Sequence, residues 1–145
     1  AIGNRIFGCD DCLAICPWNK FASKAQEQKL AAKANTDLPP LDQLLLLDDA
    51  RFRHYFAGTP VRRAGYDRFM RNILIAAGNS DDTALVPLVR AYLDYQAAVV
   101  RAMAVWALSQ LMDQNAWATL RHKYLPAETD DIVRTEWNDG QGFMQ

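Results

Sequence analysis

The stretch that decides the fold is TPVRRAGYDRFMRNILIAAGN, residues 59–79. It opens with Thr59, a residue suited to capping a helix, and Pro60, whose fixed φ suits the first helical position. It closes with Gly78 and Asn79, which favour the turn that ends a helix. Between these signals, apolar residues recur every three or four positions, as they do on one face of a helix. The stretch therefore predicts a single helix from residue 60 to residue 78.

The apolar residues of this helix, together with those of the segments that follow, predict the hydrophobic core. Five positions of the helix advance by four, four, four and three residues, and so share one face. We expect this face to pack against apolar residues of two later helices. The first set is Val61, Gly65, Phe69, Ile73 and Ala76, and the second is Leu85, Leu88, Val89, Val105 and Leu108.

Helical patterning extends over most of the chain from Leu41 onward. Met70-Arg71 followed by Ala76-Ala77 matches Val100-Arg101 followed by Trp106-Ala107 at an offset of thirty residues. Helical pairs that repeat at such an interval indicate a small α-solenoid, in which each pair buries its apolar face on the next. The predicted fold is mainly α, with further helices over residues 42–47, 49–56, 82–94, 97–112 and 115–125.

The composition is that of a globular domain and excludes several classes of protein. Half of the 145 residues are apolar, and 16 Lys and Arg stand against 17 Asp and Glu. No apolar run approaches the ~18 residues of a membrane span, and no basic region precedes an apolar core at the start, so we expect neither a membrane partner nor a signal peptide. We expect a cytoplasmic monomer. Because the first motif begins at once, we also expect this sequence to be the C-terminal piece of a longer protein.

Positive charge is concentrated between residues 51 and 71. This window holds six Arg and one Asp, a net charge of +5, which leaves −6 for the rest of the chain against the formal total of −1. A basic stripe on a nearly neutral protein indicates a defined anionic partner.

The three cysteines lie within eight residues of one another, in GCDDCLAICP. An odd number of cysteines so close together cannot form a disulfide framework. The absence of such a framework favours a reducing compartment. The spacing C-x2-C-x3-C-P of Cys9, Cys12 and Cys16 matches the last three cysteines of the ferredoxin-type run that binds 4Fe-4S clusters.

Two other interpretations of the cysteines stay open. A zinc site needs a fourth ligand, and the two histidines, His54 and His122, lie far along the chain in helical segments. Three buried thiols without a metal are the other alternative, because cysteine packs well in protein interiors.

The chain divides into four regions. We expect residues 1–22 to be the C-terminal part of a ferredoxin-like 4Fe-4S segment, and the Lys-, Gln- and Ala-rich residues 23–40 to be a linker that ends at two prolines. Residues 41–125 form the helical repeat domain. We expect the acidic tail, residues 126–145, to lack periodicity and to fray.

The cysteine segment and the start of the long helix share motifs with a known family. The motifs are GNRIFGCDDC at residues 3–12, ICPWNKF at 15–21, and GTPVRR at 58–63 with Arg71-Asn72 and Ala77-Gly78-Asn79. They resemble the second iron–sulfur motif and the opening of the C-terminal HEAT-like domain of the epoxyqueuosine reductase family, over about residues 1–112. The resemblance implies a cobalamin-dependent reductase with two 4Fe-4S clusters, which removes the epoxide oxygen from epoxyqueuosine in a tRNA anticodon. It leaves the electron donor unidentified.

The resemblance also implies roles for individual residues. Cys9 and Cys12 would bind one cluster together with an upstream cysteine, while Cys16 would complete the other. The family uses eight cluster cysteines and a cobalamin-binding catalytic domain, so this chain alone is expected to be inactive. Trp18 and Asn19 could face the cofactor, although a core tryptophan and a turn asparagine are the alternative.

Four arginines, Arg62, Arg63, Arg68 and Arg71, are predicted to bind tRNA phosphates. Arg62 and Arg63 fall in the first turn of the predicted helix, where positive side chains are unfavourable and a bound anion would offset the cost. The alternative for Arg71 is a surface ladder in which Asp67 bridges Arg63 and Arg71 at i, i+4, i+8 spacing.

Two functions from other classes remain as alternatives. The helices could form a protein-interaction scaffold whose arginines serve acidic partners. The cysteine segment could belong to a ferredoxin-like electron carrier with no RNA function, but such a carrier has no need of the arginine stripe.

Overall fold

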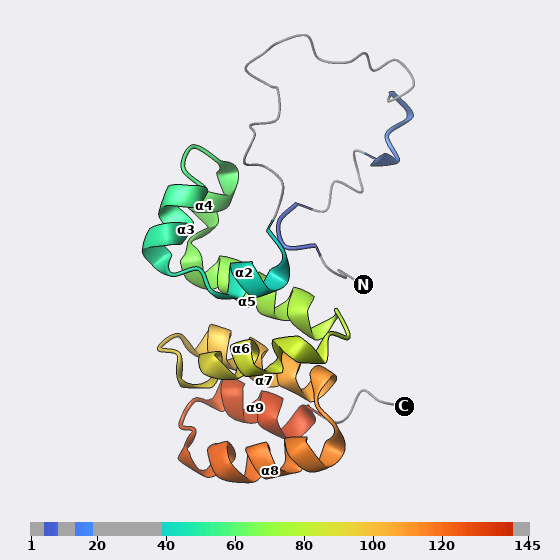
Figure 1. Cartoon of the computed structure of the whole chain (residues 1–145), viewed down its shortest axis with the longest axis vertical. Helices are drawn as coiled ribbons and strands as arrows, with labels where there is room; N and C mark the ends of the chain where they lie inside the picture. Colours follow the sequence, from blue (N-terminus) through green and yellow to red (C-terminus); the bar gives the residue numbers. More distant parts are fainter. Residues whose placement is uncertain (1–4, 9–13, 19–38, 141–145) are drawn as a thin grey trace.

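The computed structural model describes residues 5–8, 14–18 and 39–140. These residues form helices, turns and connecting segments, so the prediction of a mainly α fold is confirmed for them (Figure 1). The helices of residues 39–140 are α2 (Leu41–Leu45), α3 (Asp49–Tyr55), α4 (Pro60–Ala64), α5 (Tyr66–Gly78), η3 (Thr83–Leu85), α6 (Val86–Arg90), η4 (Ala91–Asp94), α7 (Ala98–Leu111), α8 (Gln114–Tyr124), η5 (Leu125–Ala127) and α9 (Asp131–Asp139), where η marks a 3₁₀ turn.

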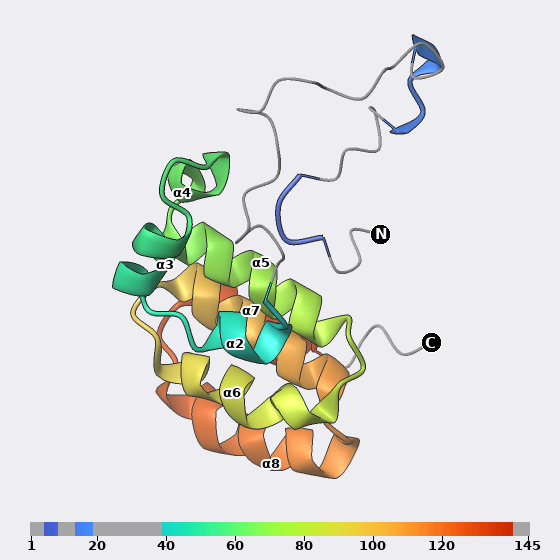
Figure 2. The same cartoon turned by 45° about the horizontal axis from the view of Figure 1, so that its top comes forward.

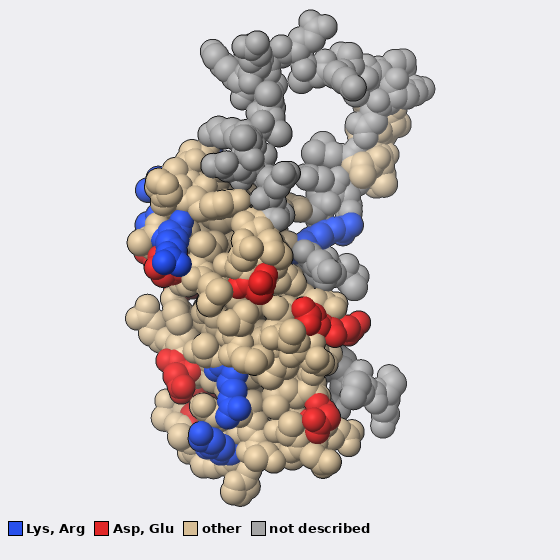
Figure 3. Space-filling view, in the orientation of Figure 1, with Lys and Arg blue, Asp and Glu red and all other residues tan. Residues whose placement is uncertain are grey.

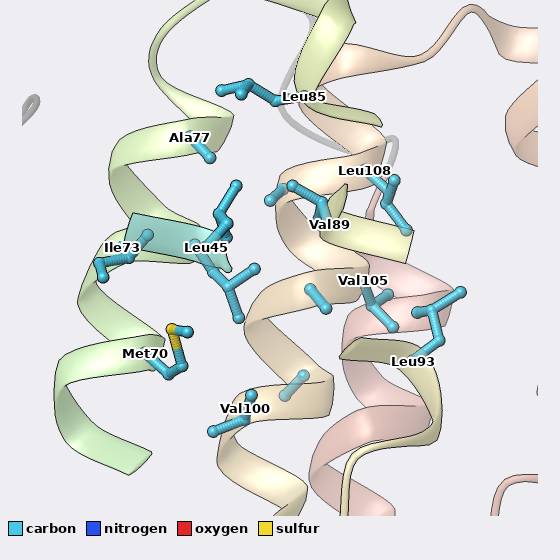
Figure 4. Packing of buried hydrophobic residues seen from close by; sticks show 14 of the residues in the cluster. Leu45, Met70, Ile73, Ala77, Leu85, Val89, Leu93, Val100, Val105 and Leu108 are labelled. Atoms are coloured by element: carbon cyan, nitrogen blue, oxygen red, sulfur yellow. The ribbon is translucent and has the colours of Figure 1, made fainter. Parts of the chain in front are cut away.

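Helices α5 and α7 form the most extensive pair in this array. Their facing residues are wholly inaccessible to solvent, including Met70 and Ile73 on α5 and Val100 and Val105 on α7. The labelled residues of Figure 4 show that the two helices run in the same direction, with the shorter α6 antiparallel to both. The thirty-residue offset thus relates two helices that lie side by side in parallel.

Gly78, the last residue of α5, allows these helices to approach closely. A Cβ atom there would lie 2.6 Å from Cζ3 of Trp106 and 3.0 Å from Cα of Ala107 on α7. Such distances are shorter than carbon atoms tolerate without displacement. A glycine that the sequence marks as a helix terminator therefore also sets the distance between two helices.

The predicted core residues on η3, α6 and α7 are largely confirmed. Leu85, Val89, Val105 and Leu108 are at most 4% exposed, while Leu88 is only half-buried. The predicted helix over 82–94 is realised as three consecutive pieces, η3, α6 and η4, of which Asp82 caps the first by accepting a hydrogen bond from the N–H of Ala84.

The prediction of a single helix over residues 60–78 is wrong. The chain breaks at Gly65, whose φ of 85° lies in the left-handed region that favours glycine, and α4 and α5 are separate helices. Val61 and Gly65 are consequently only half-buried, although Val61 still packs against the core, whereas Phe69, Ile73 and Ala76 are buried as predicted.

The expectation that residues 126–145 fray is wrong for residues 131–139, which form α9. Asp130 caps this helix by accepting from the N–H of Ile132 at 2.9 Å. Val133 and Trp137, four residues apart, are 1% and 2% exposed, and the Trp137 ring stacks on Trp117 with centroids 4.9 Å apart. The many acidic residues of this segment obscure a short apolar stripe in its sequence. This stripe packs α9 against α7.

Candidate functional site

Residues 5–8, which lead into the cysteine motif, lie beside α5 (Figures 1 and 2). Asn72 donates a hydrogen bond from its side-chain Nδ2 to the main-chain oxygen of Ile6 at 2.8 Å. The Ile6 side chain packs against the hydrophobic core. Gly8, directly before Cys9, has a φ of 67° in the left-handed region. The start of the cysteine motif is therefore attached to the helical array by both polar and apolar contacts.

A hollow of about 320 Å³ lies between this segment and α5. It is lined by residues 5–8 on one side and by residues of α5 on the other. The lining residues are Arg5, Ile6, Phe7, Gly8, Arg71, Asn72 and Ile75.

Of the predicted cluster ligands, the structure describes Cys16, which is half-buried and forms no disulfide. Cys9 and Cys12 lie outside the described residues, as does Asn19. Among the residues that are described, no group of three or more His, Cys, Asp or Glu could hold a metal ion. The donor set of the motif nonetheless fits an iron–sulfur cluster, because thiolates are the ligands that such clusters use and Cys16 keeps its thiol available.

Trp18 is not a core residue, so the alternative that assigned it to the core is wrong. Its side chain is 73% exposed, and Ile15, on the other side of Cys16, is 83% exposed. Two large apolar side chains on either side of Cys16 are thus exposed. The role of Trp18 near a cofactor stays a prediction.

Three of the four predicted arginines are exposed to solvent. Arg62 and Arg63 project from α4 and Arg68 from the first turn of α5, all exposed. Lys and Arg atoms gather over α3 and α4 in Figure 3. The argument that two arginines break the rule at a helix start is wrong, because α4 has only five residues and its first turn is also its last. We call Arg62, Arg63 and Arg68 the α4–α5 basic surface.

The two arginines of α3 belong to the same stripe of sequence but are paired with acids. Arg53 Nε lies 2.8 Å from Oδ2 of Asp49, and Arg51 Nε lies 3.7 Å from Oδ2 of Asp48. These two acids precede residue 51, so the charge count over residues 51–71 missed them. The net charge of the region is smaller than the sequence window indicates, and its free positive charge lies on α4 and α5.

The ladder of Arg63, Asp67 and Arg71 is absent from the described structure. Asp67 accepts a hydrogen bond from the Tyr95 hydroxyl at 3.0 Å. Burial, helped by this bond to a carboxylate, raises the pKa of Tyr95 to about 12. Arg71 instead donates from Nε and Nη2 to Oδ1 of Asn72, at 3.2 and 3.1 Å. Arg71 is thereby directed to the hollow beside residues 5–8.

Comparison with known proteins gives a consistent result, although no family model matches the chain. Epoxyqueuosine reductase of Xanthomonas campestris pv. campestris is 45% identical over 112 residues, which cover 75% of this chain and 31% of that protein. Its counterpart in Alicycliphilus denitrificans is 42% identical over 117 residues, covering 75% of this chain and 32% of that protein. The chain is homologous to the epoxyqueuosine reductases. This confirms the resemblance that the sequence motifs indicated.

Solved structures of epoxyqueuosine reductase share the fold as well. A selenomethionine-labelled form matches 99% of this chain and 38% of its own with a TM-score of 0.87 at 26% identity. A form with an epoxyqueuosine-modified tRNA-Tyr stem loop matches 96% of this chain and 37% of its own, with a TM-score of 0.85 at 27% identity. The chain spans about a third of the length of the curated epoxyqueuosine reductases that it matches.

Sequence reasoning missed the role of Asn72 in this reductase homologue. The motif Arg71-Asn72 contributed to the family resemblance without a structural reason. A signal was present, because Asn72 is a polar residue followed directly by the apolar run Ile73-Leu74-Ile75 on a helix whose core face is otherwise apolar. A polar residue at the border of a core face needs a hydrogen-bond partner, and here that partner comes from the distant residue Ile6.

Proposed function

We propose that the chain is the part of an epoxyqueuosine reductase that carries its second iron–sulfur motif and a HEAT-like, tRNA-binding helical domain. The observation that carries this proposal is the match, over 96% of this chain, to a reductase solved with an epoxyqueuosine-modified tRNA stem loop. The thirty-residue offset between α5 and α7 supports the HEAT-like assignment, since repeats of this kind stack parallel helices in layers.

Cys9, Cys12 and Cys16 are the residues of this chain that would hold the clusters. As the family resemblance implies, Cys9 and Cys12 serve one cluster and Cys16 the other. Removal of an epoxide oxygen as water leaves a carbon–carbon double bond and consumes two electrons and two protons. When bound, the two 4Fe-4S clusters and cobalamin supply the electron transfer and the reducing centre for this chemistry. The exposed Trp18 and its neighbour Asn19 follow Cys16 closely in sequence. They could therefore shield the cluster bound through Cys16 from water.

The α4–α5 basic surface is the proposed contact with tRNA phosphates. Its three arginines are exposed and form no ion pair within the described part of the chain. Guanidinium groups of this kind bind phosphate through paired N–H donors and give an affinity that depends on salt. Arg71, which we grouped with them from the sequence, is engaged by Asn72 and is the weakest candidate of the four.

A single reaction tests the proposed function. The complete reductase containing this sequence is reconstituted anaerobically with iron, sulfide and cobalamin, reduced, and incubated with an anticodon stem loop that carries epoxyqueuosine. Mass spectrometry should show loss of one oxygen atom from the modified base. A protein that binds clusters but neither binds nor deoxygenates the stem loop would support the electron-carrier alternative, and one that binds no cluster would support the scaffold.

The region boundaries and the cellular setting remain predictions of this proposal. They comprise the linker over residues 23–40, a monomeric state, a cytoplasmic location and an electron donor of unknown identity. None of the described helices is long and apolar enough to span a membrane.

A further inference from the structure

Asn72 joins two segments that lie 66 residues apart in the sequence. Its Nδ2 donates to the main-chain oxygen of Ile6 at 2.8 Å, while its Oδ1 accepts from Nε and Nη2 of Arg71 at 3.2 and 3.1 Å. One amide group therefore has partners on both of its ends.

The chemistry of these partners selects an amide at position 72. A peptide carbonyl can only accept a hydrogen bond, and a guanidinium group can only donate one. A side chain between them must donate at one end and accept at the other, which Asn does and Asp, its isostere, does not. A carboxylate would keep the contact with Arg71 but would face the Ile6 oxygen with a lone pair. The same reasoning fixes the amide orientation, because the reversed amide would face both partners with the wrong atom.

The anchored backbone is the one that enters the cysteine motif. Ile6 precedes Cys9 by three residues, and three residues of extended chain span at most about 10–11 Å. The Ile6 side chain packs on the core, and residues 5–8 line one wall of the hollow whose other wall is Arg71, Asn72 and Ile75 of α5. A restraint on Ile6 is therefore also a restraint on how far the first thiol can move from α5.

We propose that Asn72 is a positioning residue for the iron–sulfur motif. Its amide, held by Arg71, fastens the backbone of residues 5–8, directly ahead of Cys9, to α5. This inference rests on the proposed function only for the statement that the motif binds a cluster. The attachment itself is a property of the 145-residue chain.

The attachment is tested without any cofactor. Hydrogen–deuterium exchange of the 145-residue chain is followed in a peptide spanning residues 1–13, with a peptide from α7 as the reference for global folding. Asn72→Asp should speed exchange in the first peptide roughly tenfold and leave the α7 peptide unchanged, the effect of losing a hydrogen bond that restrains a short segment. Arg71→Ala should cause a smaller increase, because the amide keeps its bond to Ile6 but loses the group that orients it.

Asn115→Asp is the matched control, since it makes the same change of charge at an exposed residue of α8. It should leave exchange in residues 1–13 unchanged. Exchange in that peptide that is the same in wild type, Asn72→Asp and Asn115→Asp would overturn the attachment, as would an equal increase in both variants.

The positioning role is tested in the complete reductase after anaerobic reconstitution. Asn72→Asp should keep its iron content while the electron paramagnetic resonance spectrum or the reduction potential of a cluster changes, and Asn115→Asp should match the wild type in all three. A variant identical to wild type in spectrum and potential would overturn the positioning role. If wild type itself binds no cluster, the proposed function and the positioning role both fail, and the exchange experiment still decides the attachment.

Discussion

The Arg101 guanidinium and the Glu128 carboxylate form a two-pronged ion pair between α7 and the segment that leads into α9. Nε lies 3.0 Å from Oε2 and Nη2 lies 3.0 Å from Oε1, and the two side chains are only 17% and 11% exposed. Arg101 also donates to the main-chain oxygens of Tyr95 and Gln96, and Glu128 accepts from the N–H groups of Thr129 and Asp130. The pair thus connects three segments of the chain. It also satisfies two backbone N–H donors of the turn that precedes α9.

Glu128→Ala should destabilise the chain by about 2–3 kcal/mol, because it leaves a largely buried guanidinium unpaired and frees two backbone donors. Urea unfolding at neutral pH measures the change. Asp49→Ala is the matched control, since it removes the exposed partner of Arg53 and should cost less than about 1 kcal/mol. Equal effects of the two substitutions would show that the burial of the Arg101–Glu128 pair has no energetic consequence.

The same pair should make stability depend on pH in the acidic range. Hydrogen bonding from Arg101 lowers the pKa of Glu128 below its ordinary value of 4.5. The folded state then binds fewer protons than the unfolded state, so this contribution is complete above the ordinary pKa and is lost as pH falls through the folded value.

Burial raises the pKa of Glu136, which contributes with the opposite sign. For this reason the measurement compares wild type with Glu128→Gln rather than following wild type alone. The difference in unfolding free energy should be constant above about pH 6 and should shrink below about pH 4.5. A difference that persists unchanged to pH 3 would contradict the assignment of this titration to Glu128.

Gly78→Ala should destabilise the chain even though alanine favours helix formation. The new Cβ would meet the Trp106 ring and the α7 backbone, and such overpacking costs about 1–3 kcal/mol, more than the ~1 kcal/mol gained in helix propensity. A double-mutant cycle with Trp106→Leu checks the cause, because the shorter side chain leaves room for the added methyl group. The cost of Gly78→Ala should fall in that background, and an additive result would mean that the ring is not what the methyl group meets.

Cys12→Ala in the complete reductase should lower the bound iron and sulfide after anaerobic reconstitution, because a cluster that loses one of its thiolate ligands is held less tightly. Chemical determination of iron and acid-labile sulfide per protein measures the change. Iron and sulfide equal to wild type would remove Cys12 from the proposed ligands.

Arg62→Ala with Arg63→Ala in the complete reductase should weaken binding to a tRNA stem loop. Affinity falls as salt rises, and each lost phosphate contact should make the slope of log affinity against log salt less negative by about 0.7–0.9. Arg51→Ala with Arg53→Ala is the matched control, because it removes the same charge from arginines already paired with Asp48 and Asp49. If both double variants weaken the salt dependence equally, the contact is general to the basic stripe rather than specific to the α4–α5 basic surface.

The sequence was informative wherever a residue's local pattern and its packing agree. The periodicity that placed Phe69, Ile73 and Ala76 in the core holds because α5 is long enough to present one face. It failed at Gly65, because a glycine fits a helical face as well as a break, and only the backbone dihedral distinguishes the two. It failed again at α9, where the acidic residues outnumber the two buried apolar ones.

The candidate site was less accessible to sequence reasoning than the core. The cysteine motif is recognisable because its spacing is local, and the family resemblance that rests on it is confirmed. The pairing of Arg51 and Arg53 with Asp48 and Asp49 follows helical spacing and could have been found by extending the charge count by three residues. The bond between Asn72 and Ile6 joins residues 66 positions apart, so the local pattern can indicate that Asn72 needs a partner but not that Ile6 supplies it.

The attachment of Ile6 to α5 has a consequence for how the sequence can vary in length. Helix α2, which begins at Leu41, also packs on α5, so residues on both sides of the segment 9–38 contact the same helix. For a loop whose ends are fixed, each doubling of length costs only about 0.6 kcal/mol of chain entropy. Insertions or deletions within residues 19–38 should therefore be tolerated among relatives, whereas a change of even one residue between Ile6 and Cys9 would alter the distance from anchor to thiol.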